Sequence, residues 1–229
     1  MKPGAFGLAV ILAIASCGVP GRRSADSPVL SPAQVSDFPI LYAQNCAGCH
    51  GRDGQGGLAV ALGDPVYLAI AGDSTIRRVT AEGVPGTAMP AFAQQAGGML
   101  TDAQVDIIVS GIRARWAKPG ILGQAKPPAY ATQAPGDPKH GETVFSINCS
   151  SCHGVTGRGG ERASSIVDGS YLTLVSNQHL RTIAIVGLPT MGAPDWRGDV
   201  PGKPLVDKDV TDVVAWLASQ RPTFAGGSR

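Results

Sequence analysis

Apolar side chains recur at helical spacing in two segments that lie far apart along the chain. The stripe of the first segment consists of Val105, Ile108, Val109, Ile112 and Trp116. The stripe of the second consists of Val210, Val213, Val214 and Leu217. Intervals of three and four residues are typical of a helix with one buried face, and no long stretch alternates with the period of a strand. The pattern predicts an all-α chain.

Cap signals locate the ends of these helices and of several others. Thr101-Asp-Ala-Gln104 is a capping box ahead of the first stripe, and Asp207 is the expected N-cap of the second. Shorter helical patterns cover 38–45 and 138–148, the latter with Asp137 as N-cap and Pro138 at the first helical position. Two further helices are expected to end at glycines. The first is capped by Asp73 or Ser74 and ends at Gly83. The second is capped by Ser176 or Asn177 and ends at Gly187.

The order of these elements repeats, which divides the chain into two units. Asn45-Cys-Ala-Gly-Cys-His50-Gly aligns with Asn148-Cys-Ser-Ser-Cys-His153-Gly without a gap. A proline-rich stretch separates the two copies and has little room for secondary structure. We therefore expect a first domain over 36–116, a linker over 117–137, a second domain over 138–222 and a tail over 223–229.

The N-terminus resembles an export signal of the lipoprotein type. Lys2 precedes an apolar stretch from Phe6 to Ser16, which is too short to span a bilayer but suits a signal peptide over 1–16. Cys17 follows Ile14-Ala15-Ser16, as the lipidated Cys follows the small residues of a bacterial lipobox. The alternative is an ordinary cleavage site nearby, with Cys17 discarded or left as a free thiol. We expect lipidation at Cys17 and a flexible tether over 17–35.

Composition and charge narrow the possible cofactors and partners. Only 5% of the residues are aromatic, and the chain holds 31 Gly and 18 Pro. Two domains of this composition would bury thin cores, which a buried macrocycle would fill. The formal charge is +2 without a basic run, so there is no electrostatic footprint for nucleic acid.

Each Cys-x-x-Cys-His run can be interpreted in three ways: a thioredoxin-like redox pair, half of a zinc site, or a c-type haem attachment. No second ligand pair follows at the spacing of a zinc finger, and a helical chain lacks the strand–helix context of thioredoxin. The haem hypothesis explains the histidine and suits an exported protein. It assigns the thioethers to Cys46, Cys49, Cys149 and Cys152, and the proximal iron ligands to His50 and His153.

Two methionines are candidates for the sixth iron ligand. Met89 lies in a Gly- and Pro-rich loop after His50, and Met191 lies in a similar loop at almost the same distance after His153. His/Met ligation would fill both axial positions and favour electron transfer. Met99 is expected to pack instead. His179 could compete as an iron ligand but is expected at the surface or near a propionate, and His140 is expected to be solvent-exposed. Other residues that could reach haem propionates are Tyr67, Arg77, Arg78, Arg181 and Trp196.

With these motifs the chain resembles the class I cytochromes c, and its tandem copy resembles their periplasmic dihaem members. The residues that carry the resemblance are CxxCHG, the GxG that follows it, the Met-Pro step at Met89 and the closing helix LTDAQVDIIVSGIRARW. The resemblance implies two tandem class I cytochrome c domains, each with a few helices around one covalently attached haem, and therefore two haem c. The second unit departs from the pattern at Met191-Gly-Ala-Pro194.

The first functional hypothesis is a lipid-anchored electron carrier at the periplasmic face of a membrane, with no catalytic residues. It would pass single electrons between respiratory or photosynthetic redox proteins, free or as a subunit of a membrane electron-transfer complex. A dihaem peroxidase or a sulfur-compound oxidoreductase is the enzymatic alternative, which requires one haem with an open or labile position. A purely structural subunit is a third hypothesis.

Overall fold

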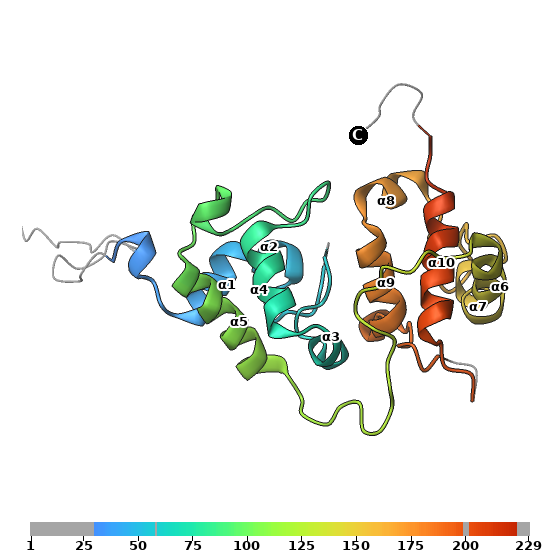
Figure 1. The fold of residues 1–229 in the computed structure, drawn as a ribbon, viewed down its shortest axis with the longest axis horizontal. Helices are drawn as coiled ribbons and strands as arrows, with labels where there is room; N and C mark the ends of the chain where they lie inside the picture. Colours follow the sequence, from blue (N-terminus) through green and yellow to red (C-terminus); the bar gives the residue numbers. More distant parts are fainter. Residues whose placement is uncertain (1–29, 58, 199–201, 224–229) are drawn as a thin grey trace, which may run out of the picture.

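The computed structural model describes residues 30–57, 59–198 and 202–223, and within them the regular elements are helices without a strand. The first unit contains α1 (Phe38–Asn45), α2 (Ala47–His50), α3 (Pro65–Ile70), α4 (Asp73–Glu82) and α5 (Asp102–Trp116). The second contains α6 (Pro138–Asn148), α7 (Ser150–His153), α8 (Gly169–Leu174), α9 (Asn177–Val186) and α10 (Asp207–Ser219). Figure 1 shows the two helical groups side by side, joined by an extended linker. The expected all-α fold is confirmed.

Short 3₁₀ turns complete the two units: η1 (Pro32–Gln34) and η2 (Gln94–Ala96) in the first, η3 (Pro189–Met191) in the second. No helix among the described residues is long and apolar enough to cross a membrane. The expected signal peptide over 1–16 and Cys17 lie outside the described residues, as do tail residues 224–229.

Most predicted helix ends agree with the structure, and two caps differ. Thr101 and Gln104 form the expected capping box, and Ser176 Oγ accepts from the backbone N–H of His179. The N-cap of α4 is Gly72 rather than Asp73 or Ser74. Asp207 is the first residue of α10 rather than its N-cap, because its carboxylate bonds to Arg181 and to the backbone N–H of Ala129.

In each unit the first and last helices cross, and an aromatic pair fills the crossing. Tyr42 of α1 meets Trp116 of α5 edge to face, with ring centroids 5.1 Å apart. Phe145 of α6 stacks on Trp216 of α10 at 4.4 Å. Such pairs contribute about 0.5–1.5 kcal/mol beyond the area that they bury. The crossings therefore fix the helices that lead into the Cys-x-x-Cys-His motifs.

Two glycines let these helices approach closely. A Cβ at Gly141 of α6 would lie 2.0 Å from the backbone oxygen of Asp212 in α10. A Cβ at Gly111 of α5 would lie 2.2 Å from the ring of Phe38 in α1. The two domains thus place the required glycine on opposite partners, Gly111 on the last helix of the first domain and Gly141 on the first helix of the second.

The second half of the linker is bound to the second domain. Arg181 of α9 is buried and donates to the carbonyl of Ala129, to Thr211 and to Asp207. The guanidinium of Arg181 therefore forms its hydrogen bonds with the linker and with α10. Gln178 donates to the carbonyl of Tyr130, and the Tyr130 ring lies against Tyr67 of α3 with centroids 6.3 Å apart. The two units touch through α3, the linker and α9.

Equivalent carbonyls at the ends of α3 and α8 are held by arginines from different places in the sequence. Arg113, inside α5, donates to the carbonyls of Leu68 and Ala71. Arg221, beyond the end of α10, donates to those of Leu172 and Val175 at 2.9 and 3.0 Å. Each therefore satisfies helix-end carbonyls that lack a partner within the helix.

The end of the predicted tether contacts the first domain. The side chain of Gln104, 2% exposed, donates to the carbonyls of Pro32 and Val35 at 2.8 and 2.9 Å. Residues 32–35 are thus attached to α5, although 17–35 was expected to be flexible throughout.

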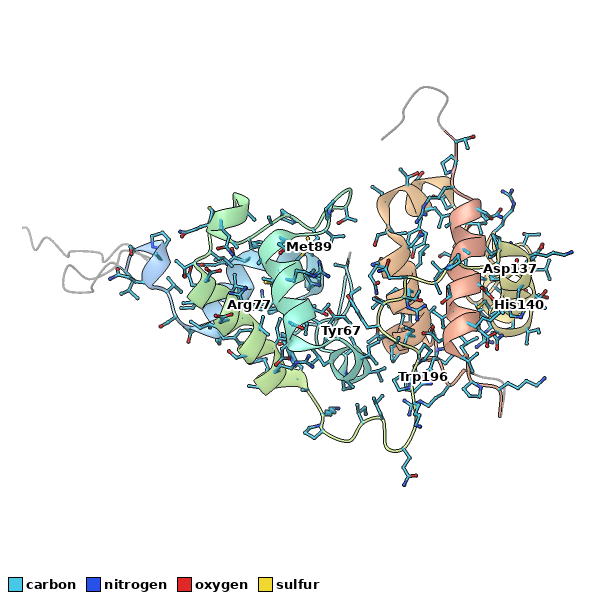
Figure 2. The ribbon with its side chains drawn as sticks, in the orientation of Figure 1. Tyr67, Arg77, Met89, Asp137, His140 and Trp196 are labelled. Carbon is cyan, nitrogen blue, oxygen red and sulfur yellow. The ribbon has the colours of Figure 1, made fainter. Side chains whose placement is uncertain are left out.

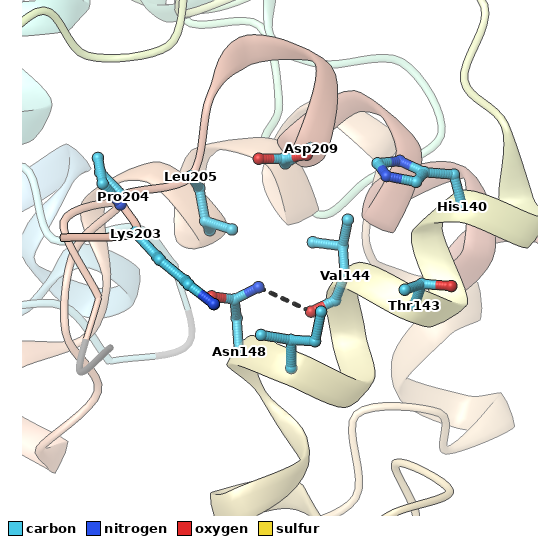
Figure 3. A pocket seen from close by; sticks show the side chains of 9 residues that line it. His140, Thr143, Val144, Asn148, Lys203, Pro204, Leu205 and Asp209 are labelled. Carbon is cyan, nitrogen blue, oxygen red and sulfur yellow. Dashed lines mark hydrogen bonds between the residues drawn. The ribbon is translucent and has the colours of Figure 1, made fainter. Parts of the chain in front are cut away.

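A buried carboxylate links α6 to α10. Asp212, 1% exposed, accepts from the backbone N–H of Asp137 at 2.8 Å and from His140 and Lys208 at 2.7 Å each. Burial alone would raise the pKa of Asp212, but these donors outweigh it and hold the pKa below its usual value. A shallow pocket lies beside this cluster, between α6 and the segment that leads into α10 (Figure 3). His140 and Asn148 line it at the two ends of α6, and it contains none of the candidate cysteines or iron ligands.

We predict that Gly141→Ala destabilises the protein by about 1–2 kcal/mol. Overpacking costs about 1–3 kcal/mol, and the ~1 kcal/mol that alanine gains in a helix offsets only part of it, since the obstructing atom is a backbone oxygen. Denaturant unfolding of the holoprotein measures the change. Gly169→Ala, whose Cβ would make only an ordinary contact of 3.4 Å with Pro222, is the control and should unfold at the wild-type midpoint or slightly above it.

We also predict that Asp212 makes stability depend on pH in the acid range. Because its folded pKa is depressed, its contribution is complete above the unfolded value of about 3.9 and disappears as the pH falls through the folded pKa. Asp212→Asn should lose about 1–3 kcal/mol at pH 7 through the weakened buried hydrogen bonds. It should also unfold with a flatter dependence on pH below 4 than the wild type. Exposed Glu142, changed to Gln, is the control; an equal flattening there would refute the assignment.

Candidate functional site

The two Cys-x-x-Cys-His motifs fold as short helical turns directly after α1 and α6. The backbone N–H of Cys46 donates to the carbonyl of Tyr42, and that of His50 to the carbonyl of Cys46, at 2.8 and 3.0 Å. Cys149 and His153 repeat these bonds to Phe145 and Cys149 at 2.8 and 3.0 Å. None of the four motif cysteines forms a disulfide. Each turn thus gathers two thiols and one imidazole.

The glycine after each histidine reverses the chain. Gly51 and Gly154 have φ of 79° and 74°, which residues with a Cβ rarely adopt. A Cβ added at Gly51 would also lie 2.5 Å from the backbone oxygen of Gly56, and one added at Gly154 would lie 2.3 Å from that of Gly159. The chain therefore returns past the motif and brings a backbone carbonyl to the histidine ring.

That carbonyl fixes each imidazole. Nδ1 of His50 lies 2.8 Å from the oxygen of Val60, and Nδ1 of His153 lies 2.8 Å from that of Ser164. A carbonyl only accepts, so the proton resides on Nδ1 and Nε2 presents a lone pair. Ring nitrogens that bind a metal are commonly oriented in this way by a partner on the other nitrogen.

The two histidines differ in enclosure. His50 is 8% exposed, its Nε2 is buried without a hydrogen-bond partner, and burial lowers its pKa. His153 is only partly buried. A buried nitrogen without a partner is costly and indicates a ligand. The first site is therefore the more enclosed of the two.

These features fit a tethered haem better than the other interpretations of the motif. Burial raises the pKa of the Cys46 and Cys149 thiols to about 11, unlike the lowered pKa of a reactive redox cysteine. No three His, Cys, Asp or Glu side chains gather as a metal cluster in the part of the chain that the structure describes. A haem needs two thiols and one free imidazole nitrogen per turn, and both turns supply them.

The candidate methionines are placed differently. Met89 is half-buried in the loop between α4 and η2 (Figure 2), whereas Met191 ends η3 and is 80% exposed. Met99 was expected to pack but is 79% exposed, because the Gly97-Gly98 turn folds back onto Phe92 and carries Met99 outward.

Other candidate residues have protein partners. Arg77 pairs with Asp102 and Asp106, and His140 with Asp212. His179 is partly buried on α9, and burial lowers its pKa.

Some of the site's residues were missed by sequence reasoning. The carbonyls of Val60 and Ser164 gave no signal, since any residue type supplies one. The asparagine before each motif was also missed, although the repeat of Asn45 and Asn148 was a signal. Asn45 donates to the carbonyl of Leu41 and Asn148 to that of Val144, at 2.8 and 2.9 Å.

A family model described as cytochrome c oxidase, cbb3-type, subunit III matches the chain twice, over residues 33–110 and 136–217. Each match contains one Cys-x-x-Cys-His turn. The two matches agree with the repeat inferred from the sequence.

Curated relatives come from two kinds of respiratory complex. The cbb3-type cytochrome c oxidase subunit CcoP of Azospirillum sp. (strain B510) is 30% identical over 56% of this chain and 41% of its own length. The cytochrome bc1 complex cytochrome c subunit of Mycobacterium bovis (strain ATCC BAA-935 / AF2122/97) is 27% identical over 82% of this chain and 64% of its own. The chain thus spans less than two thirds of the length of either relative.

Taken with the duplicated turns, the double match makes this chain a member of the family described as cytochrome c oxidase, cbb3-type, subunit III, with two tandem c-type cytochrome domains that take two haem c.

Proposed function

We propose that the chain is an electron-transfer protein that passes single electrons through two haem c groups as part of, or between, membrane respiratory complexes. The observation that carries the proposal is the matched pair of imidazoles, each fixed through Nδ1 with Nε2 left free. A bound haem would supply one-electron ferric–ferrous chemistry, whose potential depends on the axial ligands and their surroundings.

The proposed roles follow the two turns. Cys46 with Cys49, and Cys149 with Cys152, would each form two thioethers to one haem. His50 and His153 would bind the irons through Nε2. Met89 would be the sixth ligand in the first domain, and Met191 is the candidate that the sequence offers in the second.

The surrounding residues tune these ligands. The carbonyls of Val60 and Ser164 hold the imidazoles in one orientation and make Nε2 a better donor. Burial of His50 excludes water from the proximal side of the first site. The contact between Tyr67 and Tyr130 keeps the domains adjacent, which supports electron passage between them.

The relatives support a membrane complex as the partner, since their names are those of subunits of a cbb3-type oxidase and of a bc1 complex. We propose that the protein carries electrons and is not an enzyme by itself. We also propose export to the periplasmic face, cleavage after residue 16 and anchoring by lipid on Cys17, with domain limits near 36–116 and 138–222. The lipobox-like run before Cys17 supports the anchor.

The first test is the number of haems. The purified protein should contain two covalent haems per chain and take up two electrons in a potentiometric titration. Replacing both cysteines of one motif, Cys46→Ala with Cys49→Ala or Cys149→Ala with Cys152→Ala, should leave one haem. Ser150→Ala, inside the second motif but with its hydroxyl hydrogen-bonded to the backbone carbonyl of Ser146, should keep two. Two haems in either double variant would refute the assigned attachment sites.

The second test concerns location and partner. The wild-type protein should sediment with membranes, be labelled by a fatty acid and co-purify with a quinol-oxidising or terminal oxidase complex. Cys17→Ser should lose the label. Since several acyl chains are needed for firm attachment, its membrane-bound fraction should fall by about tenfold or more in high salt. A Cys17→Ser variant that remained in the membrane would show another anchor.

A further inference from the structure

The two candidate axial loops have the same length but carry their methionines at different positions. Both begin at a left-handed glycine, Gly83 in the first domain and Gly187 in the second, with φ of 71° and 73°. Both reach a proline at the same distance from that glycine, Pro90 and Pro194. Aligned on these ends, the residue equivalent to Met89 is Ala193.

Backbone contacts support this alignment. The N–H of Val84 donates to the oxygen of Met89 at 3.0 Å, and the equivalent N–H of Leu188 donates to that of Ala193 at 3.0 Å. A Cβ at Gly83 would meet the oxygen of Met89 at 2.7 Å, and one at Gly187 would meet that of Ala193 at 2.7 Å. Both contacts thus pair the same residues.

Met191 is instead the counterpart of Thr87. The N–H of Thr87 donates to the oxygen of Val84 at 3.2 Å, and that of Met191 to the oxygen of Leu188 at 2.8 Å. The Thr87 hydroxyl also donates to the oxygen of Val84 and accepts from the N–H of Met89, at 2.8 and 3.2 Å. This hydroxyl fixes the backbone at Met89, and the second loop lacks it.

The distances from the histidines do not reveal this difference in methionine position. Met89 and Met191 follow His50 and His153 at almost the same distance along the chain, but the second unit has one extra position between its histidine and its loop. Once that extra position is allowed for, the counterpart of Met89 is Ala193 and not Met191.

We propose that the second haem has an exchangeable sixth position, because its loop presents Ala193 where the first loop presents the Met89 thioether. The proposal rests on the proposed haem attachment in both domains. Met191 lies two positions out of register with Met89 and takes the place of Thr87, so its thioether is not the counterpart of the Met89 ligand. The site accepts a small σ-donor ligand, such as imidazole or cyanide on the ferric iron. A bound water would leave the ferric iron as imidazole or cyanide binds, so that one iron–ligand bond would be broken and one formed with no change in oxidation state.

The experiment is a titration of the ferric holoprotein with imidazole, followed by absorption and magnetic resonance spectra, after a haem count. A count below two would fail the proposed function and would be recognised before any titration. With two haems present, we expect one haem per chain to bind imidazole. The far-red band of methionine–iron ligation should persist for the other haem.

Variants assign the two haems. Ala193→Met should weaken imidazole binding at the second haem by about tenfold or more and add far-red absorption. Met89→Ala should make both haems bind imidazole. Met191→Ala should bind as the wild type does.

Three results would overturn the proposal. The first is a wild-type protein with methionine bands from both haems, one of which Met191→Ala removes. The second is a second haem that binds imidazole only after His179→Ala, which would assign the sixth position to His179. The third is an Ala193→Met variant that folds, holds two haems and binds imidazole as strongly as the wild type.

Discussion

The hydrogen bond from each motif histidine to a backbone carbonyl is the interaction on which the rest of the site depends. It requires the chain to turn back soon after the histidine, and so it requires glycine at positions 51 and 154. It also requires the motif turn to be held in place, and the crossed terminal helices provide this through their aromatic pairs. The packing of the domain and the chemistry of the imidazole are therefore parts of one arrangement.

A comparison of the two domains shows which features can differ while this arrangement is kept. The turn around each histidine is nearly the same in both, down to the length of the bond from Nδ1, although His50 is the more buried of the two. The loop that carries Met89 differs from its counterpart by one hydroxyl and by the place of one thioether. With the proposed ligation, this difference would give the two haems different affinities for electrons and for ligands, since the axial ligand is a main determinant of haem potential.

Much of the fold was predictable from local signals. The helices predicted at 38–45 and 138–148 have those bounds, Asp137 and Pro138 begin the second as expected, and Thr101 with Gln104 forms the expected box. Asp207 was wrongly predicted to be an N-cap. Its carboxylate instead accepts hydrogen bonds from buried Arg181 and from the backbone N–H of Ala129 in the linker. The carbonyls of Val60 and Ser164 left no signal in residue type. The register of the second loop was obscured by a single inserted residue; the glycine and proline that bound each loop give the correct register, and the backbone contacts support it.

The arginines at the ends of α3 and α8 bear on how interchangeable the two halves are. Arg113 comes from the last helix of its domain, and Arg221 from beyond the end of α10. A chimera that exchanged the closing helices would bring each arginine to the wrong height, leaving several carbonyls without donors. The two domains share a fold, but the closing helix of each is specific to its own domain. Neither closing helix can replace the other without loss of these hydrogen bonds.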